Sequence, residues 1–196
     1  MRAKKTERIG VFGGTFNPPH MGHLVIAERA RAAASLDRVL FVPAALPPHK
    51  LGRSIVSPQH RLAMVRLAIS GNRFFQVSDI EVRKGGISYT VDTLRLLAQT
   101  MPHAELYLIL GGDSVAEYQS WKEPSEIRGL ATLLMYPRET MDRMPVAGVE
   151  LLTGPLIGIS STEIRGKVAR GESIRYLVPD SVARYIRSRR LYVNQA

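Results

Sequence analysis

Two histidines in a short loop rich in glycine and proline are the residues of this chain best suited to chemistry. The loop lies between an apolar run, Ile9–Phe12, and a helical pattern that begins near Leu24, and it reads Gly13-Gly14-Thr15-Phe16-Asn17-Pro18-Pro19-His20-Met21-Gly22-His23. This layout predicts a loop at the end of a strand, with His23 on the first turn of the next helix. Glycines let a phosphate approach backbone N–H groups closely, and a helix N-terminus favours negative charge. Two imidazoles there indicate chemistry on a phosphate as well as phosphate binding.

His20 and His23 are three residues apart, so both imidazoles can face one pocket. In the phosphate interpretation they donate N–H bonds to phosphate oxygens and stabilise charge that develops during phosphoryl chemistry. The loop matches neither the G-x-G-x-x-G pattern nor a Walker loop. One alternative is a metal pair, which needs a further ligand such as His49, and another is a structural role. Because the glycine-rich setting favours a phosphate over a bare cation, we expect no metal bound by protein side chains.

Two glycine- or proline-rich turns follow other expected strands. Pro47-Pro48-His49-Lys50 follows the second strand as Pro18-Pro19-His20 follows the first, so both fall at the same sheet edge, unless the second is an ordinary surface turn. Gly111-Gly112-Asp113-Ser114 follows the most apolar strand, where glycines allow a ligand to approach and Asp113 can accept hydrogen bonds. The alternative is a strand-to-helix turn with Asp113 as the N-cap.

A hydroxyl-rich segment near the C-terminus, Ile159-Ser160-Ser161-Thr162-Glu163-Ile164-Arg165, fits two roles at once. Ser160 and Glu163 make a capping box, which is a structural explanation for that pair. It does not explain three consecutive hydroxyls followed one turn later by Arg165. Hydroxyls and free N–H groups at a helix start, with an arginine alongside, form a cradle for a polyphosphate.

Two further segments suit the ring and the carboxylate of a small ligand. Trp121, the only tryptophan, follows the Gly111 turn and can stack on an aromatic ring, although a lone tryptophan also serves as a core or surface anchor. Ser88-Tyr89-Thr90 begins a helix whose free backbone amides can hold a carboxylate, with helix capping as the alternative.

Strand-like and helical patterns alternate along the whole chain. We expect strands at Ile9–Phe12, Arg38–Val42, Phe74–Val77, Ile80–Val82, Glu105–Leu110 and Leu130–Tyr136. We expect helices at Gly22–Ser35, from Ser57-Pro58, from a Thr90 cap, at Ser160–Ala169 and at Pro179–Arg189, and a loop at Arg138–Gly148. This order predicts an α/β fold: a Rossmann-like, doubly wound, mostly parallel sheet with helices on both faces. In such sheets ligands bind beyond the carboxyl ends of the strands, where the strand order reverses.

The bulk composition fits one soluble domain. The 196 residues predict a single domain over 1–196, with flexible tails at 1–7 and 194–196. Absence of cysteine excludes disulfides and thiolate zinc sites. With no signal peptide and no apolar run of transmembrane length, we expect a cytoplasmic protein without a membrane partner. The net charge of +10 suits nucleotides. We expect no nucleic-acid partner because aromatic residues do not accompany the basic ones.

Together these segments resemble the nucleotidyltransferase α/β phosphodiesterase superfamily. Its marks, G-x-F-x-P-x-H-x-G-H and I-S-S-T-x-x-R, stand here as Gly14–His23 and Ile159–Arg165. Within the superfamily the chain is similar to the bacterial nicotinate-nucleotide adenylyltransferases over roughly residues 8–193. The similarity rests on chain length, on Pro-Pro-His-Lys, Ser-Tyr-Thr-x-x-Thr-Leu and Gly-x-Asp-Ser with a downstream tryptophan, and on Tyr-Leu-Val-Pro-Asp-x-Val.

The resemblance implies a reaction in which ATP and nicotinate mononucleotide give deamido-NAD and pyrophosphate. The 5′-phosphate attacks the α-phosphorus of ATP in line, without a covalent enzyme intermediate, and Mg²⁺ travels with the ATP phosphates. The resemblance implies catalytic roles for His20, His23 and Arg165. It implies that ATP is bound by Gly13, Gly14, Thr15, Phe16, His20, His23, Gly111, Asp113, Ser160, Ser161, Thr162 and Arg165. It implies that the mononucleotide is bound by His49, Lys50, Tyr89, Thr90 and Trp121.

Three places depart from the family pattern. Asn17 stands where aspartate is common, Ala44-Ala45 stands where relatives often carry asparagine, and the usual Arg-Pro-Gly order is altered at Tyr136-Pro137-Arg138. Another adenylyltransferase of the superfamily, with nicotinamide mononucleotide or phosphopantetheine as acceptor, is one alternative. A non-enzymatic nucleotide-binding protein is another.

Overall fold

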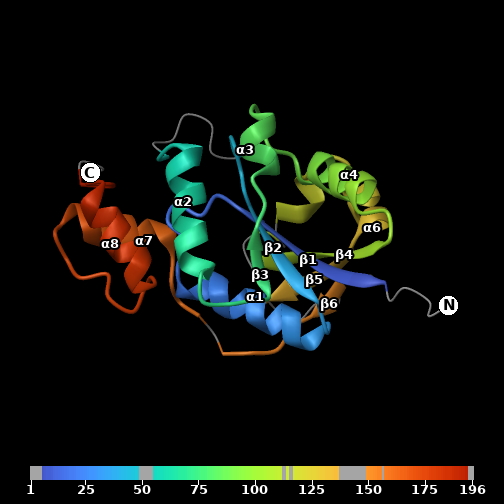
Figure 1. Cartoon of the computed structure of the whole chain (residues 1–196), viewed down its shortest axis with the longest axis horizontal. Coiled ribbons are helices and arrows are strands. Elements are labelled where there is room, and N and C mark those ends of the chain that lie inside the picture. The colour runs from blue at the N-terminus through green and yellow to red at the C-terminus, as the bar shows by residue number, and fades with distance from the viewer. Residues whose placement is uncertain are drawn as a thin grey trace.

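Six parallel strands form one sheet at the centre of the molecule. The computed structural model describes residues 6–48, 55–111, 114, 117–136, 149–155 and 157–193. The strands lie in the order β3-β2-β1-β4-β5-β6 (Figure 1). Their bounds are β1 Glu7–Gly14, β2 Arg38–Pro43, β3 Phe75–Val77, β4 Ala104–Gly111, β5 Thr132–Tyr136 and β6 Val149–Leu151. Each pair is parallel, and the strand order reverses between β1 and β4, which confirms the doubly wound fold.

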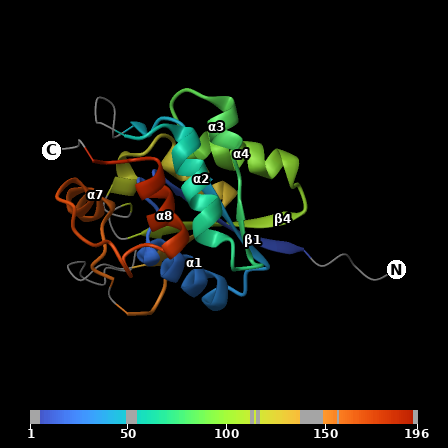
Figure 2. The same cartoon turned by 60° about the vertical axis from the view of Figure 1, so that its left-hand side comes forward.

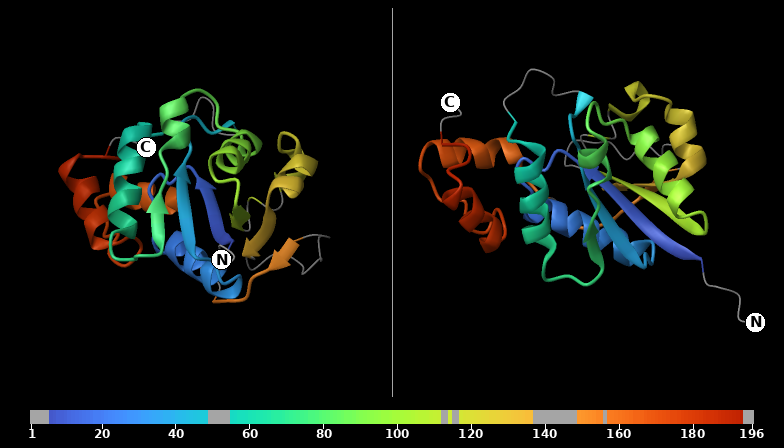
Figure 3. Two further views of the ribbon diagram at one scale, coloured as in Figure 1. Left: turned by 45° about the vertical axis from the view of Figure 1, so that its right-hand side comes forward. Right: turned by 45° about the horizontal axis from the view of Figure 1, so that its top comes forward.

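Helices pack on both faces of this sheet, as predicted. Figure 3 shows the strands between α1 on one side and α4 on the other. The helices are α1 Met21–Ala33, α2 Pro58–Ile69, α3 Ile80–Lys84, α4 Thr90–Thr100, α6 Pro124–Leu130, α7 Ser161–Ala169 and α8 Asp180–Ser188, with a 3₁₀ turn, η2, at Tyr118–Ser120. Among the described helices, none is long and apolar enough to span a bilayer.

Alternating side chains of the central strands build two separate cores. Phe12 and Phe41 pack with Ala27 and Ala30 of α1, whereas Val11 belongs to the core beneath α4 and α6. The strands are therefore apolar on both faces, as expected for a buried parallel sheet. The two alanines are fully buried, and their small side chains let α1 lie close to the sheet.

A third core joins the two C-terminal helices to α2. Met64 of α2 packs with Ile164 of α7 and with Val182 and Ile186 of α8. Figures 1 and 2 both show α7 and α8 beside α2. The start of α7 is thereby held next to the loop that follows β1, although the two segments are more than 140 residues apart in sequence.

Most of the expected elements are present, and several differ. The segment at 80–82 is helical, not a strand, because the helical turn brings Glu81 to the Thr93 hydroxyl; Asp79 and Arg83 form an exposed ion pair on its outer side, at 2.8 Å. The strand expected from Leu130 begins at Thr132, since Leu130 ends α6. Neither α6 nor β6 was predicted.

The other two differences concern element ends. Tyr89, not Thr90, is the N-cap of α4, and Thr90 is its first helical residue. The N-terminal tail, expected to include residue 7, ends earlier because Glu7 is paired with Ala104 in the sheet. The loop expected at Arg138–Gly148 lies outside the described residues.

Candidate active site

One cavity lies at the carboxyl edge of the strands and collects most of the predicted site residues. Its volume is about 550 Å³, which suits a nucleotide-sized ligand. The predicted residues that line it are Gly13, Gly14, Thr15, His20, His23, Tyr89, Thr90, Gly111, Trp121, Ser160, Ser161 and Thr162. A larger hollow of about 940 Å³ lies between α7 and α8, but it contains none of the predicted site residues. The strand-end cavity is therefore the candidate active site.

The two histidines form a compact pair at the start of α1. His20 is the N-cap and is 7% exposed, and the ring centroids of His20 and His23 are 3.7 Å apart. Nδ1 of His23 accepts the backbone N–H of His20 at 3.1 Å. Because Nδ1 is an acceptor, the proton of neutral His23 sits on Nε2. His23 thus offers a fixed N–H donor.

The glycines of the loop leave room for this pair. A Cβ on Gly22 would lie 3.0 Å from Nδ1 of His20, and a Cβ on Gly14 would lie 2.9 Å from the Phe16 ring. The Phe16 ring is buried and packs edge-on against His23, with centroids 5.0 Å apart. The side chain of Phe16 thus lies in the core beside His23, and the expected contact of Phe16 with ATP stays a prediction.

The start of α7 closes the phosphate end of the cavity and holds the loop after β1. Ser160 caps α7 by accepting the backbone N–H of Glu163 at 3.1 Å. The Ser161 hydroxyl donates to the carbonyl of Pro18 at 2.9 Å, and Arg165 donates to the carbonyl of Asn17 at 2.9 Å. Arg165 also lies against the Thr162 hydroxyl, 3.3 Å from its Nη2, and its expected role at the phosphates stays a prediction.

Tyr89, Thr90 and Trp121 line the opposite end of the cavity, as predicted. The side chain of Tyr89, the N-cap of α4, makes no hydrogen bond to the first turn of the helix. The backbone N–H groups there can therefore receive an anion. Trp121 is half-buried and packs on Tyr118 with ring centroids 5.8 Å apart. Its buried Nε1 has no hydrogen-bond partner within the described part of the chain. One face of the site is therefore aromatic and the neighbouring one donates N–H groups.

Sequence reasoning missed two charged residues of this end. Nζ of Lys122 lies 5.0 Å from the centre of the Tyr89 ring and 3.3 Å from Asp92, and Lys122 lines the cavity. Glu81 also lines the cavity and accepts the Thr93 hydroxyl at 2.6 Å. Burial raises the pKa of Glu81. Lys122 could have been found because it directly follows the tryptophan. Glu81 was missed because residues 80–82 were expected to form a strand.

Not all of the residues singled out in the sequence are found in the lining of the cavity. His49, Lys50, Asp113 and Arg138 lie outside the described residues. Asn17, the departure from aspartate, is buried, and its Oδ1 accepts the hydroxyl of Tyr192 at 3.0 Å. Its side chain is thus engaged with the C-terminal segment and does not line the cavity. Within the described ranges, no group of three or more histidine, aspartate or glutamate residues is placed to hold a metal ion.

These features define an α/β protein with a parallel sheet of Rossmann strand order and a glycine-rich loop carrying two histidines after its first strand, at the edge where such folds bind nucleotides. Residues 11–167 match the model of the cytidylyltransferase-like family. The probable nicotinate-nucleotide adenylyltransferase of Desulfitobacterium hafniense (strain Y51) is 42% identical over 95% of this chain and 96% of its own length. That of Thermomicrobium roseum is 45% identical over 94% of this chain and 91% of its own. The chain therefore belongs to the nicotinate-nucleotide adenylyltransferase family and is a nucleotidyltransferase.

A solved structure has the same fold at low sequence identity. The nicotinic acid mononucleotide adenylyltransferase of Plasmodium falciparum, complexed with NaAD, matches with a TM-score of 0.82 and 19% identity. The match covers 97% of this chain and all of that one, 100%. The Rossmann-like arrangement is thus shared over the matched 97% of this chain.

Proposed function

We propose that this enzyme transfers the adenylyl group of ATP to nicotinate mononucleotide, giving deamido-NAD and pyrophosphate in the cytoplasmic synthesis of NAD. The observation that carries the proposal is the polarity of the cavity. One end holds His20, His23 and the hydroxyls of α7, which suit polyphosphate, while the other holds Trp121 and free amides, which suit a ring with a carboxylate. Transfer between two phosphates requires both ends to open into one cavity.

The reaction needs orientation and charge stabilisation more than a strong base. A 5′-phosphate oxygen of the mononucleotide forms the new bond to the α-phosphorus, and the bond to the β-phosphate breaks, so pyrophosphate leaves with that electron pair. A phosphate monoester is already ionised at neutral pH. In the proposal the Nε2–H of His23 donates to the α-phosphate as charge develops, which is electrostatic stabilisation of the transition state.

Ser160, Ser161 and Thr162 receive the β- and γ-phosphates at the start of α7. Arg165 acts by holding Asn17 and, through it, the histidine loop. The phosphate end offers hydroxyl, imidazole and N–H donors, and this donor set fits phosphate oxygens rather than a directly bound cation. Mg²⁺ would accompany the ATP phosphates and water, where it neutralises charge on the leaving pyrophosphate.

Recognition of the acceptor rests on the first turn of α4 and on two neighbours. The amides after Tyr89 bind the nicotinate carboxylate, and Trp121 stacks on the pyridine ring. Among the described residues that line the cavity, Lys122 is the only lysine or arginine. Its positive charge favours the acid over the amide. His49 and Lys50 complete the proposal near the mononucleotide phosphate.

The deciding assay measures pyrophosphate release with ATP and three acceptors: nicotinate mononucleotide, nicotinamide mononucleotide and phosphopantetheine. We expect a strong preference for the first acceptor. Equal rates with the acid and the amide would reject carboxylate recognition. Preference for phosphopantetheine would assign the chain to another transfer, and absence of turnover with all three would favour a nucleotide-binding protein.

A further inference from the structure

Arg61 is a buried arginine that the mechanism above does not use. It lies on α2 and is 1% exposed, and its guanidinium donates its hydrogen bonds to backbone carbonyls. Nη1 donates to Thr15 at 2.9 Å, Nη2 to Ala45 at 2.8 Å, and Nε to Val56 at 3.1 Å. Burial lowers its pKa. A buried charge is tolerated only when it is well hydrogen-bonded, so these three carbonyls account for its presence.

Glu81 of α3 lies on the other side of the same residue, Ala45, and reaches it through Ser88. Its carboxylate accepts the hydroxyl of Thr93 at 2.6 Å, and the nearby Ser88 side chain acts to lower its pKa, against the effect of burial. The Ser88 oxygen in turn accepts the backbone N–H of Ala45 at 2.9 Å. Ala45 is thus held at its carbonyl by Arg61 and at its N–H through Ser88 by Glu81.

The chain of contacts joins the two ends of the active site. Thr15 belongs to the loop that carries His20 and His23, and Ser88 directly precedes Tyr89 and the first turn of α4. Backbone bonds add to the link: Ala44 N–H donates to Gly14 at 2.9 Å, and Ser88 N–H donates to Leu46 at 3.0 Å. The loop after β2 is therefore the bridge between the phosphate loop and the acceptor loop.

We propose that Arg61 and Glu81 are positioning residues that hold these loops as one frame, so that occupancy of the ATP end sets the affinity of the acceptor end. The inference rests on the proposed function for the identity of the two ligands. Neither residue is assigned to substrate in this scheme. Each acts through the backbone of Ala45, and removal of either one leaves buried polar groups unsatisfied. The frame would convert binding of one substrate into preorganisation for the other.

The sole tryptophan provides a direct readout, because Trp121 lines the acceptor end. Nicotinate mononucleotide is titrated by tryptophan fluorescence, with and without a non-hydrolysable ATP analogue. In the wild type we expect the analogue to tighten mononucleotide binding about fivefold or more, within the usual range of coupling between sites. In Glu81→Gln and in Arg61→Lys we expect the coupling to fall to about twofold or less. Glutamine keeps the size of Glu81, and lysine keeps the charge of Arg61 without its planar fork.

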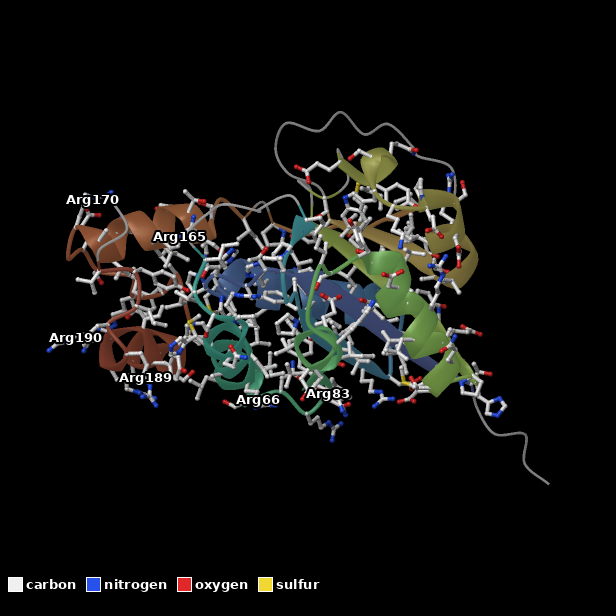
Figure 4. The ribbon with its side chains drawn as sticks, turned by 90° about the horizontal axis from the view of Figure 1, so that it is seen from above. Arg66, Arg83, Arg165, Arg170, Arg189 and Arg190 are labelled. Atoms are coloured by element: carbon white, nitrogen blue, oxygen red, sulfur yellow. The ribbon has the colours of Figure 1, made fainter. Side chains whose placement is uncertain are left out.

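Two exposed arginines supply matched controls. Arg66 lies on α2 with Arg61, and Arg83 lies on α3 with Glu81, and Figure 4 shows both at the outer edge of the molecule. Arg66→Lys and Arg83→Gln should retain wild-type coupling. Thermal unfolding identifies variants that fail to fold, and in that case Thr93→Val and Ser88→Ala, which each remove one hydroxyl of the frame, are titrated instead.

Loss of coupling in the frame variants alone supports the proposal. Full coupling in folded frame variants, or no coupling in the wild type, overturns it. The proposed function is judged separately by turnover of the wild type with the acceptor panel. An enzyme that prefers another acceptor but shows coupling with that acceptor would reject the substrate assignment and retain the frame.

Discussion

The two ends of the cavity are built in different ways. The phosphate end comes from contiguous segments, the loop at 13–23 and the start of α7, and its histidines are positioned by their own helix cap and by Phe16. The acceptor end draws on α3, α4 and the segment after η2, and it depends on a buried polar network beneath them. The comparison teaches that the histidine loop is a local motif that the tertiary fold joins to α7, whereas the acceptor end also depends on a buried polar network between its elements. We therefore expect substitutions at the two ends to change different kinetic constants.

The largest effect is expected at His23. His23→Ala removes the fixed Nε2–H donor, so kcat should fall by about 10²-fold or more, with a small change in the KM of either substrate. Steady-state pyrophosphate release measures both constants. His103→Ala, in an exposed turn before β4, is the matched control and should behave as wild type. An unchanged kcat in a folded His23 variant would remove the transition-state role.

The second effect is expected at Trp121, on the acceptor end. Trp121→Ala removes the stacking surface, worth about 1–3 kcal/mol, so the KM for nicotinate mononucleotide should rise about tenfold or more. The KM for ATP should change little. Trp121→Phe should recover much of the loss because it keeps an aromatic face. A variant whose melting temperature falls while both KM values hold would make Trp121 a core residue only.

The third effect, at Lys122, is smaller because the side chain is 40% exposed. Lys122→Met should raise the KM for nicotinate mononucleotide about threefold, as an exposed charge contributes about 0.2–1 kcal/mol. The KM for the uncharged amide should stay constant. The difference in KM between the variant and wild type should shrink in about 0.5 M salt, because salt at that ionic strength screens exposed charges strongly. An equal rise in KM for the acid and the amide acceptors would mean that Lys122 acts through packing and not through its charge.

The smallest effect concerns the pH dependence of stability at Glu81. Burial raises its pKa, so the folded state binds this proton more tightly than the unfolded state does, and stability falls as pH rises from about 4.5 through the raised pKa. Glu81→Gln cannot titrate. The unfolding free energy of the variant relative to wild type should therefore move in favour of the variant across that interval. Urea unfolding at several pH values measures it, with the exposed Glu150→Gln as control. A difference in unfolding free energy between variant and wild type that does not change with pH would contradict the burial of this carboxylate.

The phosphate end was predictable because short-range rules govern it. Glycines at a strand end, a histidine one turn into a helix and a hydroxyl cap at Ser160 each carry their meaning within a few residues. The role of Arg165 was not predictable in the same way. Its bond goes to Asn17, 148 residues away in sequence, and only the packing of α7 and α8 on α2 brings the two together.

The acceptor end shows why the rest required coordinates. Ile80 and Val82 alternate with Glu81 and Arg83, a pattern typical of a strand, yet the segment is a helix. The hydroxyl of Thr93 donates to the partly buried Glu81 carboxylate, and a sequence period does not record such a bond. Tertiary context overrode the local preference here.

By itself, the sequence determined the α/β class, the strand-and-helix alternation, and the two segments, the histidine loop and Ser160–Thr162, that line the cavity. These follow from hydrophobic periodicity and from the conformational limits of glycine, proline and cap residues, all of which act locally. Only the tertiary structure decided that Arg61 and Ser88 bind the carbonyl and the N–H of Ala45, and that Lys122 faces the ring of Tyr89. The reason is that a buried charged side chain pairs with the groups that are near it in space, and the fold decides which groups those are.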